Sequence, residues 1–352
     1  MARIDEFLRE VLQRRGSDLH FLAGDPARIR VYGDLTVLRP ERLDAQTVKE
    51  TLYEIMPRKA IERFEAQDGA DFAYTLGEQG RFRVNVLRHL SGMGAVFRAI
   101  PSKALTMDEL DLPPAVRALG RANNGLILVT GKTGSGKSTT LAAIIDDINR
   151  REKGHILTIE DPIEFLHPRK SCLISQREVG VHSPSFAAAL HSALREDPDV
   201  ILVGELRDYE TMSIAVTAAE MGILVMGTLH TNGAAQTVDR MVNVFPADKQ
   251  SHVRTMLSTS LRGVVSQQLL QRVDGQGRIA ALEVLVNTPA VSNLIRQGKL
   301  DQLETTMQSG AQFGMRTMDS AIQQLLEQGR ISGREAYKKA INKAKFEAVK
   351  DA

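Results

Sequence analysis

The fold of this chain is decided by residues 131–138, which read Gly131-Lys132-Thr133-Gly134-Ser135-Gly136-Lys137-Ser138. Their spacing matches the P-loop pattern G-x-x-x-x-G-K-[S/T]. Residues 126–129, immediately before, are all apolar and predict a buried strand of a parallel sheet, while residues 139–145 open a helix. A strand, a glycine-rich turn and a helix in this order point backbone N–H groups and the positive end of the helix dipole at a phosphate.

The P-loop pattern gives these residues their roles. The glycines let the backbone approach an anion closely, Lys137 reaches the β- and γ-phosphates, and the Ser138 hydroxyl holds Mg²⁺. We therefore expect a nucleoside-triphosphate site whose nucleotide-binding residues are Gly131, Thr133, Gly134, Ser135, Gly136, Lys137, Ser138 and Thr139.

Length and composition narrow the class of protein. A chain of 352 residues is long enough for about two domains, and the single cysteine, Cys172, excludes an intramolecular disulfide. A net charge of +2, no tryptophan and five tyrosines offer neither a basic stripe nor stacking platforms for nucleic acid. The sequence holds no run of 18 apolar residues, so we expect no transmembrane segment, and its charged start at 1–6 does not resemble a signal peptide.

Residues 1–100 predict a small α+β domain. Apolar residues at helical spacing in 45–56 indicate a helix. In 81–87, apolar residues alternate with Arg, Arg and Asn, which is typical of a strand with one buried and one wet face, and 95–100 pairs naturally with it. Residues 101–115 carry three prolines and no clear period, so we expect a linker there.

Arginines gather on these two strands without matching acids among them; they are Arg81, Arg83, Arg88 and Arg98. One interpretation is a solvated sheet face. The other is that some of them reach a phosphate across a subunit boundary, as arginine fingers do. The sequence leaves both open.

Residues 116–352 predict an α/β domain, because apolar runs alternate with helical segments as in a mostly parallel sheet. The run 156–159 ends in Glu160-Asp161-Pro162-Ile163-Glu164. Acids at the carboxyl end of such a strand lie where ligands bind, and a carboxylate there can orient and deprotonate an attacking water. The alternative is an acidic turn exposed to solvent.

Two further strand ends carry polar residues. The run 200–203 precedes Gly204 and Glu205 and resembles a Walker B strand, whose acid holds Mg²⁺ directly or through water, although glycine stands where Asp is usual. The run 223–229 precedes His230, which is either structural or senses a γ-phosphate at the same sheet edge.

The end of the chain predicts mainly helices, at 249–262, 290–297 and 317–328, with a last helix from Ser332 onward. Lysines make the last helix basic; they are Lys338, Lys339, Lys343, Lys345 and Lys350. This indicates a solvated face or, alternatively, docking to an acidic partner or a membrane surface.

The order and spacing of these motifs resemble one family, the secretion-type AAA-like ATPases, with 131–138 as its Walker A motif. The other matching motifs are an Asp box at 158–165, an atypical Walker B at 204–205, a His box at 227–232 and first-domain segments at 17–20 and 81–85. Within the family, the chain is most similar to the motors that retract type IV pili. Residues 290–297 resemble a retraction-associated segment, with Ser292 and Gln297 in place of Arg and Glu.

The resemblance implies a fold, cofactors and partners. The fold is an N-terminal PAS-like α+β domain at 1–100, then a RecA-like P-loop ATPase domain with a helical C-terminal tail at 116–352. The implied cofactors are ATP and Mg²⁺. The implied protein is a cytoplasmic homohexamer, peripheral at the inner membrane, that works with a pilus platform protein, binds no nucleic acid directly and powers retraction by ATP hydrolysis.

The resemblance also implies roles by position. Glu164 would be the catalytic acid/base, Glu205 would support Mg²⁺ through water, and His230 would contact or sense the γ-phosphate. Arg83 and Arg98 would reach the nucleotide of a neighbouring subunit.

Other functions stay open at this point: a paralogous pilus or type II secretion ATPase, a nucleotide-gated scaffold with incidental hydrolysis, or a RecA-like nucleic-acid motor. Steady-state turnover without a partner separates a motor from a scaffold. The balanced charge and few aromatic residues disfavour the nucleic-acid motor.

Overall fold

The computed structural model describes residues 2–31, 34–77, 79–100, 104–275 and 277–351. The chain divides into two compact units, which are Met1–Lys103 with Glu164–Leu166 and Ala104–Ile163 with His167–Ala352. Part of the predicted linker, 101–103, lies outside the described residues. The rest, 104–115, groups with the second unit, because Met107 and Leu112 are buried in that unit's core.

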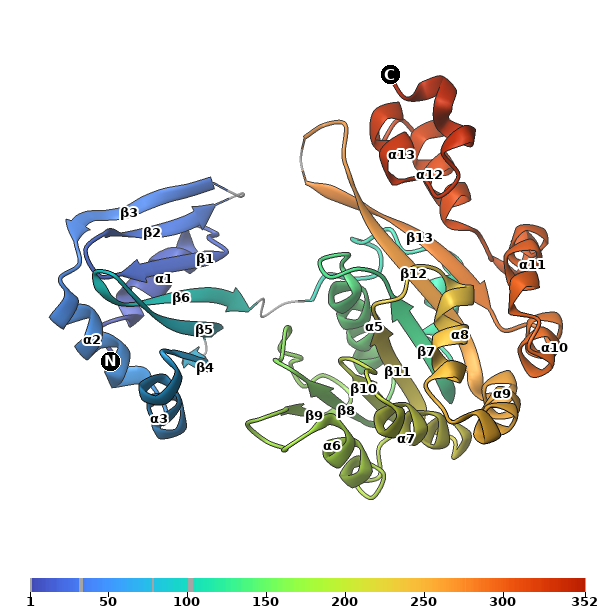
Figure 1. The fold of residues 1–352 in the computed structure, drawn as a ribbon, viewed down its shortest axis with the longest axis horizontal. Helices are drawn as coiled ribbons and strands as arrows, with labels where there is room; N and C mark the ends of the chain where they lie inside the picture. The colour runs from blue at the N-terminus through green and yellow to red at the C-terminus, as the bar shows by residue number, and fades with distance from the viewer. Residues whose placement is uncertain (1, 32–33, 78, 101–103, 276, 352) are drawn as a thin grey trace. The chain divides into compact units, whose positions relative to one another are not determined.

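The first unit combines an antiparallel sheet with helices (Figure 1). Its elements are α1 (Asp5–Gln13), β1 (Asp18–Leu22), β2 (Pro26–Val31), β3 (Asp34–Arg42), α2 (Ala45–Ile55), α3 (Arg58–Gln67), β4 (Gly69–Leu76), β5 (Gly80–His89) and β6 (Gly92–Ile100). The strands lie in the order β3-β2-β1-β6-β5-β4, and neighbours are antiparallel. An α+β arrangement is therefore present, while the PAS-like assignment stays a prediction.

Alternation along β5 builds the core of the first unit. Phe82, Val84 and Val86 are fully buried, whereas Arg83 and Asn85 are exposed. This is the period of two that a strand with one covered face requires. The predicted pairing of 95–100 with 81–87 is confirmed, in strands β6 and β5.

Helix α3 is absent from the sequence-based prediction. Pro57 ends α2 but also serves as the N-cap of α3, where a missing N–H costs little. Ala60 and Phe64, four residues apart, bury the inner face of α3 in the core. A proline that stops one helix therefore also starts the next.

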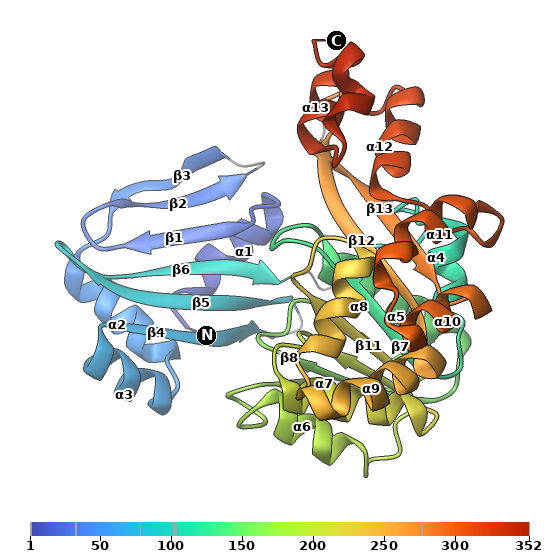
Figure 2. The same ribbon diagram turned by 45° about the vertical axis from the view of Figure 1, so that its right-hand side comes forward.

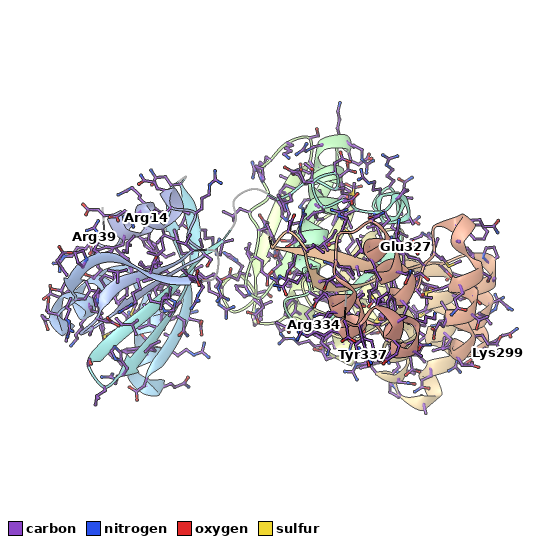
Figure 3. All side chains as sticks on the ribbon, turned by 90° about the horizontal axis from the view of Figure 1, so that it is seen from above. Arg14, Arg39, Lys299, Glu327, Arg334 and Tyr337 are labelled. Atoms are coloured by element: carbon purple, nitrogen blue, oxygen red, sulfur yellow. The ribbon has the colours of Figure 1, made fainter. Side chains whose placement is uncertain are left out.

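Ion pairs connect α1 with β3. Arg39 on β3 pairs with Glu6 and Glu10 of α1, and its guanidinium carbon lies 4.2 Å from the centre of the Phe7 ring. Arg14, labelled with Arg39 in Figure 3, also reaches Glu10, at 3.7 Å. Since exposed pairs contribute little alone, the stacking of Arg39 on Phe7 is the firmer contact.

The second unit is a mixed sheet with helices packed on both faces (Figures 1 and 2). Up to the last strand its elements are α4 (Pro114–Leu119), β7 (Gly125–Thr130), α5 (Lys137–Arg151), β8 (His155–Glu160), β9 (Leu173–Glu178), α6 (Phe186–Ala193), β10 (Val200–Val203), α7 (Tyr209–Glu220), β11 (Leu224–Leu229), α8 (Ala234–Asn243), α9 (Ala247–Ser260), β12 (Leu261–Gln271) and β13 (Arg278–Val286). The strand order is β13-β12-β7-β11-β10-β8-β9; β13 is antiparallel to β12, and the other pairs are parallel. The predicted α/β class is confirmed.

Both faces of β7 are buried. Leu126 and Leu128 belong to the cluster that includes residues of α7, α8 and α9, while Ile127 and Val129 belong to the cluster that includes residues of α5. A strand covered on both sides must be apolar throughout. This explains the continuous apolar run that precedes the glycine-rich loop.

Helices follow β13 to the end of the chain. They are α10 (Pro289–Gln297), η1 (Leu300–Gln302), α11 (Leu303–Ser309), η2 (Ala311–Phe313), α12 (Met318–Glu327), α13 (Gly333–Lys339) and η3 (Lys343–Val349). The prediction of one last helix from Ser332 is wrong, because Ala340 leaves helical geometry (ψ 145°) and separates α13 from η3. Within the described ranges, no helix is both long and apolar enough to cross a bilayer.

A buried histidine follows β8. His167 is 8% exposed, and its backbone N–H donates to Oε1 of Gln176 at 2.9 Å. Burial lowers the pKa of its imidazole to about 4; the Asp146 carboxylate acts against this and the Lys170 ammonium adds to it. His167 is therefore neutral in the folded protein at physiological pH.

We expect this histidine to destabilise the fold in mild acid. In the unfolded chain it takes up a proton near pH 6.5, and in the folded chain only near pH 4, so stability falls as the pH drops between these values. From pH 7 to pH 5 the loss from this group is about 2 kcal/mol. Urea unfolding of the wild type and His167→Gln at both pH values checks this; equal losses in the two proteins would contradict it.

Candidate active site

The loop between β7 and α5 closes tightly because of its glycines. Gly131, Gly134 and Gly136 have φ angles of 137°, 77° and 91°, which other residues rarely adopt. A Cβ on Gly131 would stand 2.4 Å from the carbonyl oxygen of Gln267 on β12, whereas a Cβ on Gly134 would meet no described atom within 4 Å. The first glycine is therefore fixed by contact with the neighbouring strand, and Gly134 only by its backbone angle.

Lys137 and Ser135 fit the loop for an anion. The Lys137 ammonium donates to the carbonyl oxygens of Gly131 at 2.8 Å and Lys132 at 3.3 Å. The Ser135 hydroxyl is buried and has no hydrogen-bond partner among the described residues. A buried hydroxyl of this kind calls for an acceptor, and a phosphate oxygen would supply it. Lys137 also begins α5, so the N-terminal dipole of the helix adds positive potential.

Gln267 supports the loop and was not among the predicted site residues. Its Oε1 accepts a hydrogen bond from the Thr140 hydroxyl at 2.8 Å, and its Nε2 lies 2.7 Å from where a Cβ on Gly136 would stand. Gln267 is 3% exposed. The signal for it is a pair of glutamines inside the otherwise apolar run of β12.

The other polar strand ends lie on the same edge of the sheet. β7, β11, β10 and β8 are consecutive parallel neighbours, so the residues that follow them, His230 after β11 and Glu205 after β10, share the edge of the P-loop. The structure brings these two side chains together, with Nε2 of His230 3.4 Å from Oε1 of Glu205.

Arg207 completes this group. Its Nη2 lies 2.7 Å from Oε2 of Glu205. Burial acts to raise the pKa of Glu205, but the hydrogen bond and charge of Arg207, with a smaller contribution from His230, hold that pKa below its usual value. Glu205 is therefore ionised at neutral pH. Arg207 was not among the predicted site residues; the sequence signal for it is its place two residues after Glu205.

Gly204 explains the departure from the usual Walker B pattern. A Cβ at this position would stand 3.2 Å from Cα of Glu160 on β8, so a larger residue would push the two strand ends apart. The backbone around Gly204 is fixed by bonds to the flanking strands, from its N–H to the carbonyl of Ile159 at 2.7 Å and from the Thr228 hydroxyl to its own carbonyl.

Glu160, the last residue of β8, and Glu164, four residues later, differ in their surroundings. Glu160 is 8% exposed and accepts from the Thr158 hydroxyl at 2.7 Å and from Nε2 of Gln176 at 3.4 Å. Glu164 is exposed, after an Ile163 whose backbone N–H donates to Oε2 of Glu178 at 3.2 Å. The catalytic role of Glu164 stays a prediction.

Three of the four arginines named from the sequence have acidic partners, so the expectation of unmatched charge is wrong for these three. Arg98 on β6 lies opposite Asp18 on β1, with Nε 2.8 Å from Oδ1. Arg83 lies 3.7 Å from Asp71 on β4, and Arg88 lies 2.5 Å from Asp68. The acids come from segments distant in sequence that the sheet brings alongside, which a local pattern does not reveal. Arg83 and Arg98 face each other in the β5–β6 register.

The residues expected to hold Mg²⁺ would bind it through oxygen atoms. The described residues hold no group of three or more His, Cys, Asp or Glu side chains that could bind a metal ion by themselves. Mg²⁺ in nucleotide sites is held by one or two protein oxygens together with phosphates and water, so a cage of side chains is not required. Ser138, half-buried in the first turn of α5, and Glu205 offer the hard oxygen donors that this ion prefers.

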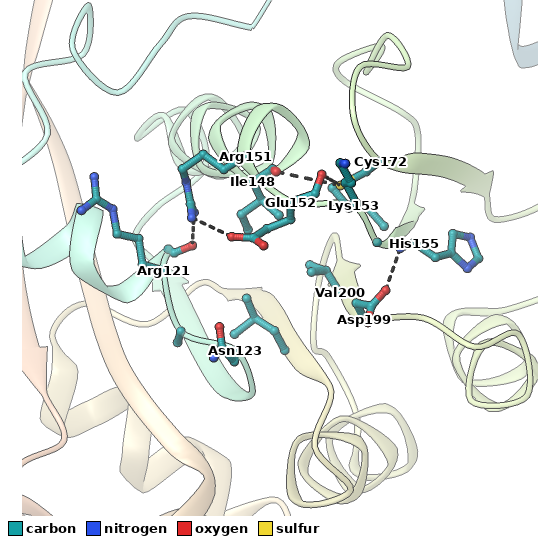
Figure 4. Close-up of a pocket in the computed structure, with 15 residues that line it drawn as sticks. Arg121, Asn123, Ile148, Arg151, Glu152, Lys153, His155, Cys172, Asp199 and Val200 are labelled. Atoms are coloured by element: carbon teal, nitrogen blue, oxygen red, sulfur yellow. Dashed lines mark hydrogen bonds and ion pairs between the residues drawn. The ribbon is translucent and has the colours of Figure 1, made fainter.

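A hollow lies at the amino-terminal edge of the same sheet, opposite the edge that carries the P-loop (Figure 4). It has a volume of about 250 Å³, and its lining includes the first residues of β8, β10 and β11. The polar groups there bond to one another, Arg151 with Glu152 at 2.8 Å and the His155 N–H with Asp199 at 2.8 Å. Since ligands of such sheets bind at the carboxyl edge, we do not place the nucleotide here.

These features define a class of protein, an α/β protein with a P-loop at the carboxyl edge of a mostly parallel sheet. The sequence model of the type II/IV secretion system protein family matches residues 1–338. The chain belongs to this family.

Individual relatives agree with the resemblance seen in the sequence. The type IV pilus retractation ATPase PilT of Pseudomonas aeruginosa is 49% identical over 96% of this chain and 98% of that protein. The twitching motility protein of Neisseria gonorrhoeae is 50% identical over 89% of this chain and 84% of that protein. The crystal structure of the pilus retraction motor PilT with bound ADP has a TM-score of 0.91, with 41% identity over 99% of this chain and 100% of that chain. The similarity to pilus retraction motors is therefore confirmed.

We predict that Gly131→Ala weakens ATP binding by roughly 10–100-fold, because the added Cβ collides with the Gln267 carbonyl and the φ of 137° is strained for alanine. Gly134→Ala is the matched control, since its φ is also positive but its Cβ has room; we expect less than about 10-fold from it. Titration with a fluorescent ATP analogue measures both. Equal affinities would show that the contact with β12 does not shape the loop.

Proposed function

We propose that this chain is an ATP-hydrolysing motor that powers the retraction of type IV pili and hence twitching motility. The observation that carries the proposal is a P-loop with a buried, partnerless Ser135 hydroxyl on the same sheet edge as the Glu205–His230 pair. The relatives named for pilus retraction match along nearly the whole chain. We further propose that the protein is cytoplasmic and works peripherally at the inner membrane, with a pilus platform protein as its partner.

In the proposed mechanism the loop holds the triphosphate. Its backbone N–H groups and the Lys137 ammonium bind the β- and γ-phosphates, and the Ser135 hydroxyl donates to a phosphate oxygen. Mg²⁺, when bound, neutralises charge on the phosphates; Ser138 would hold it directly and Glu205 through water. Thr133 and Thr139 flank the phosphates at the mouth of the loop and at the first turn of α5.

Glu164 is the proposed catalytic acid/base. Its exposed carboxylate takes the proton of the attacking water, which raises the nucleophilicity of that water as it approaches the γ-phosphorus. His230 contacts the γ-phosphate side, and its neighbour Glu205 fixes the direction of the imidazole. When the γ-phosphate is released, His230 would lose its contact with the phosphate. The loop 230–233, which carries His230, would then be free to change its position.

We propose that the site is completed in a homohexamer. Arg83 and Arg98 sit opposite each other on β5 and β6, each beside one acid. The 3.7 Å pair of Arg83 with Asp71 is long, and both side chains are about half exposed, so this guanidinium can exchange its carboxylate for a phosphate at little cost. Such arginines lent by a neighbour give a reason for a ring.

The experiment that tests the function is deletion of the gene in its host. We expect surface filaments to accumulate and retraction to stop, as scored by fluorescence imaging of labelled pili. Re-expression of the wild type should restore retraction. Normal retraction in the deletion strain would move the function to a paralogous pilus or type II secretion ATPase.

We predict that Glu164→Gln binds ATP normally but loses turnover by at least about 100-fold, because the amide cannot accept the proton of water. Asp161→Asn, which removes another exposed acid from the same turn, is the control and should keep most of its activity. Phosphate release and nucleotide binding are measured in parallel. Near-normal turnover in Glu164→Gln would remove this residue from the mechanism.

We predict that Arg83→Ala lowers turnover by about 10³–10⁵-fold with nucleotide binding largely intact. Arg88→Ala is the control, since Arg88 lies on the same strand but stacks on Phe64 and pairs with Asp68. Arg98→Ala should also cripple hydrolysis, but it is a less specific test because Arg98 neutralises the buried Asp18. Full activity of Arg83→Ala in a protein that sediments as a monomer would contradict the cross-subunit role.

A further inference from the structure

A buried carboxylate, Glu283 on β13, joins the N-termini of two helices. Its Oε1 accepts from the backbone N–H of Ala234, the first residue of α8, at 2.6 Å. Its Oε2 accepts from the N–H of Met318, the first residue of α12, at 3.1 Å. Glu283 is 5% exposed and forms no ion pair within the described part of the chain. Two helix N-termini therefore stand in for a cation.

Helix α8 directly follows residues 230–233, which we call the His230 loop because it carries the residue proposed to sense the γ-phosphate. Glu283, Ser266, Thr130 and Leu229 are successive cross-strand partners on β13, β12, β7 and β11. This row ends one residue before the P-loop and one residue before His230. The Ser266 hydroxyl accepts from the N–H of Gly233 at 2.9 Å. The segment 230–234 is thus held by two side chains from the far strands of the sheet.

Helix α8 depends on this carboxylate, because its N-cap residue is Gly233, which has no side chain to cap it. Gly233 has a φ of 107°, and a Cβ there would stand 3.4 Å from Oε1 of Glu283. By contrast, α12 has a cap of its own in Thr317. The Thr317 hydroxyl accepts from the N–H of Ser320, whereas Glu283 accepts from the N–H of Met318. Glu283 is therefore not the sole acceptor at the start of α12, as it is among side chains for the N–H of Ala234.

We propose that Glu283 is a positioning residue that couples the His230 loop to α12, so that the state of the γ-phosphate side reaches the C-terminal helices. This inference rests on the proposed function. If the loop moved α8 away from α12, one carboxylate oxygen would lose its only N–H donor while still buried, which is costly. The two helices are therefore bound to move together. Burial raises the pKa of Glu283, and its hydrogen bonds from the N–H groups of Ala234 and Met318 oppose this rise.

The test compares Glu283→Gln with a matched control. The amide keeps the size of the side chain but turns an NH₂ toward one of the two N–H donors, so one link is lost. Asp319→Asn is the control, because Asp319 is a buried carboxylate that also accepts two backbone N–H bonds, but these come from Ile341 and Asn342 rather than from residues 230–234. Steady-state kcat and KM for ATP are measured on the full-length protein, with wild-type turnover as the reference.

We expect Glu283→Gln to lower kcat at least tenfold with KM within twofold, and Asp319→Asn to leave both within twofold. Hydrogen exchange gives the second readout. In the wild type, a non-hydrolysable ATP analogue should slow exchange in peptides covering 230–243 and 314–327 together; in Glu283→Gln only the first should respond. A kcat of Glu283→Gln within twofold of wild type, or an equal fall in both variants, would overturn the coupling role.

Two outcomes keep the inference separate from the proposed function. A wild type that does not hydrolyse ATP would reject the proposed function, whereas an active wild type with an unaffected Glu283→Gln would reject only the coupling. If Glu283→Gln does not fold, as judged by circular dichroism, Ser266→Ala is used instead. It frees the Gly233 N–H but keeps both bonds of Glu283, so exchange at 314–327 should still respond to the analogue together with 230–243; loss of the response at 314–327 would overturn the proposal.

Discussion

The parallel pairing of β7 with β11, β10 and β8 is the constraint on which the site depends. Parallel neighbours end at the same edge, so whatever follows each strand is brought to one line regardless of its distance in sequence. Strands covered on both faces are mostly apolar, so charged side chains gather where the strands stop. The P-loop and His230 directly follow β7 and β11, and Glu205 is the second residue after β10. The chemistry therefore sits where the core permits polarity.

Three buried carboxylates in this protein are compensated in three different ways. Asp18 has the guanidinium of Arg98, Glu160 has a threonine hydroxyl and a glutamine amide, and Glu283 has the N-termini of two helices. An arginine side chain can exchange its carboxylate partner for another anion that approaches it, whereas backbone N–H donors are fixed to their helices. This difference explains why the arginine pairs suit a role in exchange between partners, and why Glu283 suits a role in transmitting movement.

The sequence predicts those features that depend on local pattern. The P-loop, the buried strands around it and the polar strand ends follow from spacing and from apolar runs. Gln267, the cross-strand acids of Arg83 and Arg98, and Glu283 do not, because each acts through a neighbour that only strand pairing supplies. Polar residues inside a mostly apolar strand were the signal available, a pair of glutamines for Gln267 and a lone glutamate for Glu283. Helix α3 was not predicted for another reason, since Pro57 both ends α2 and caps α3.

The helix α10, which follows β13, is fixed by contacts that lie apart from the P-loop and the Glu205–His230 pair. In α10, Ser292 donates to the carbonyl of Ser258 on α9 at 2.6 Å, and Asn287 before the helix donates to the same carbonyl at 3.1 Å. An arginine at position 292, as in the retraction-associated segment, is too long to make this bond without shifting α10 from α9. None of these atoms belongs to the P-loop or to the Glu205–His230 pair. A substitution at this position therefore changes how α10 docks while the hydrolytic site keeps its own contacts, so a family with one site can vary in the work it performs.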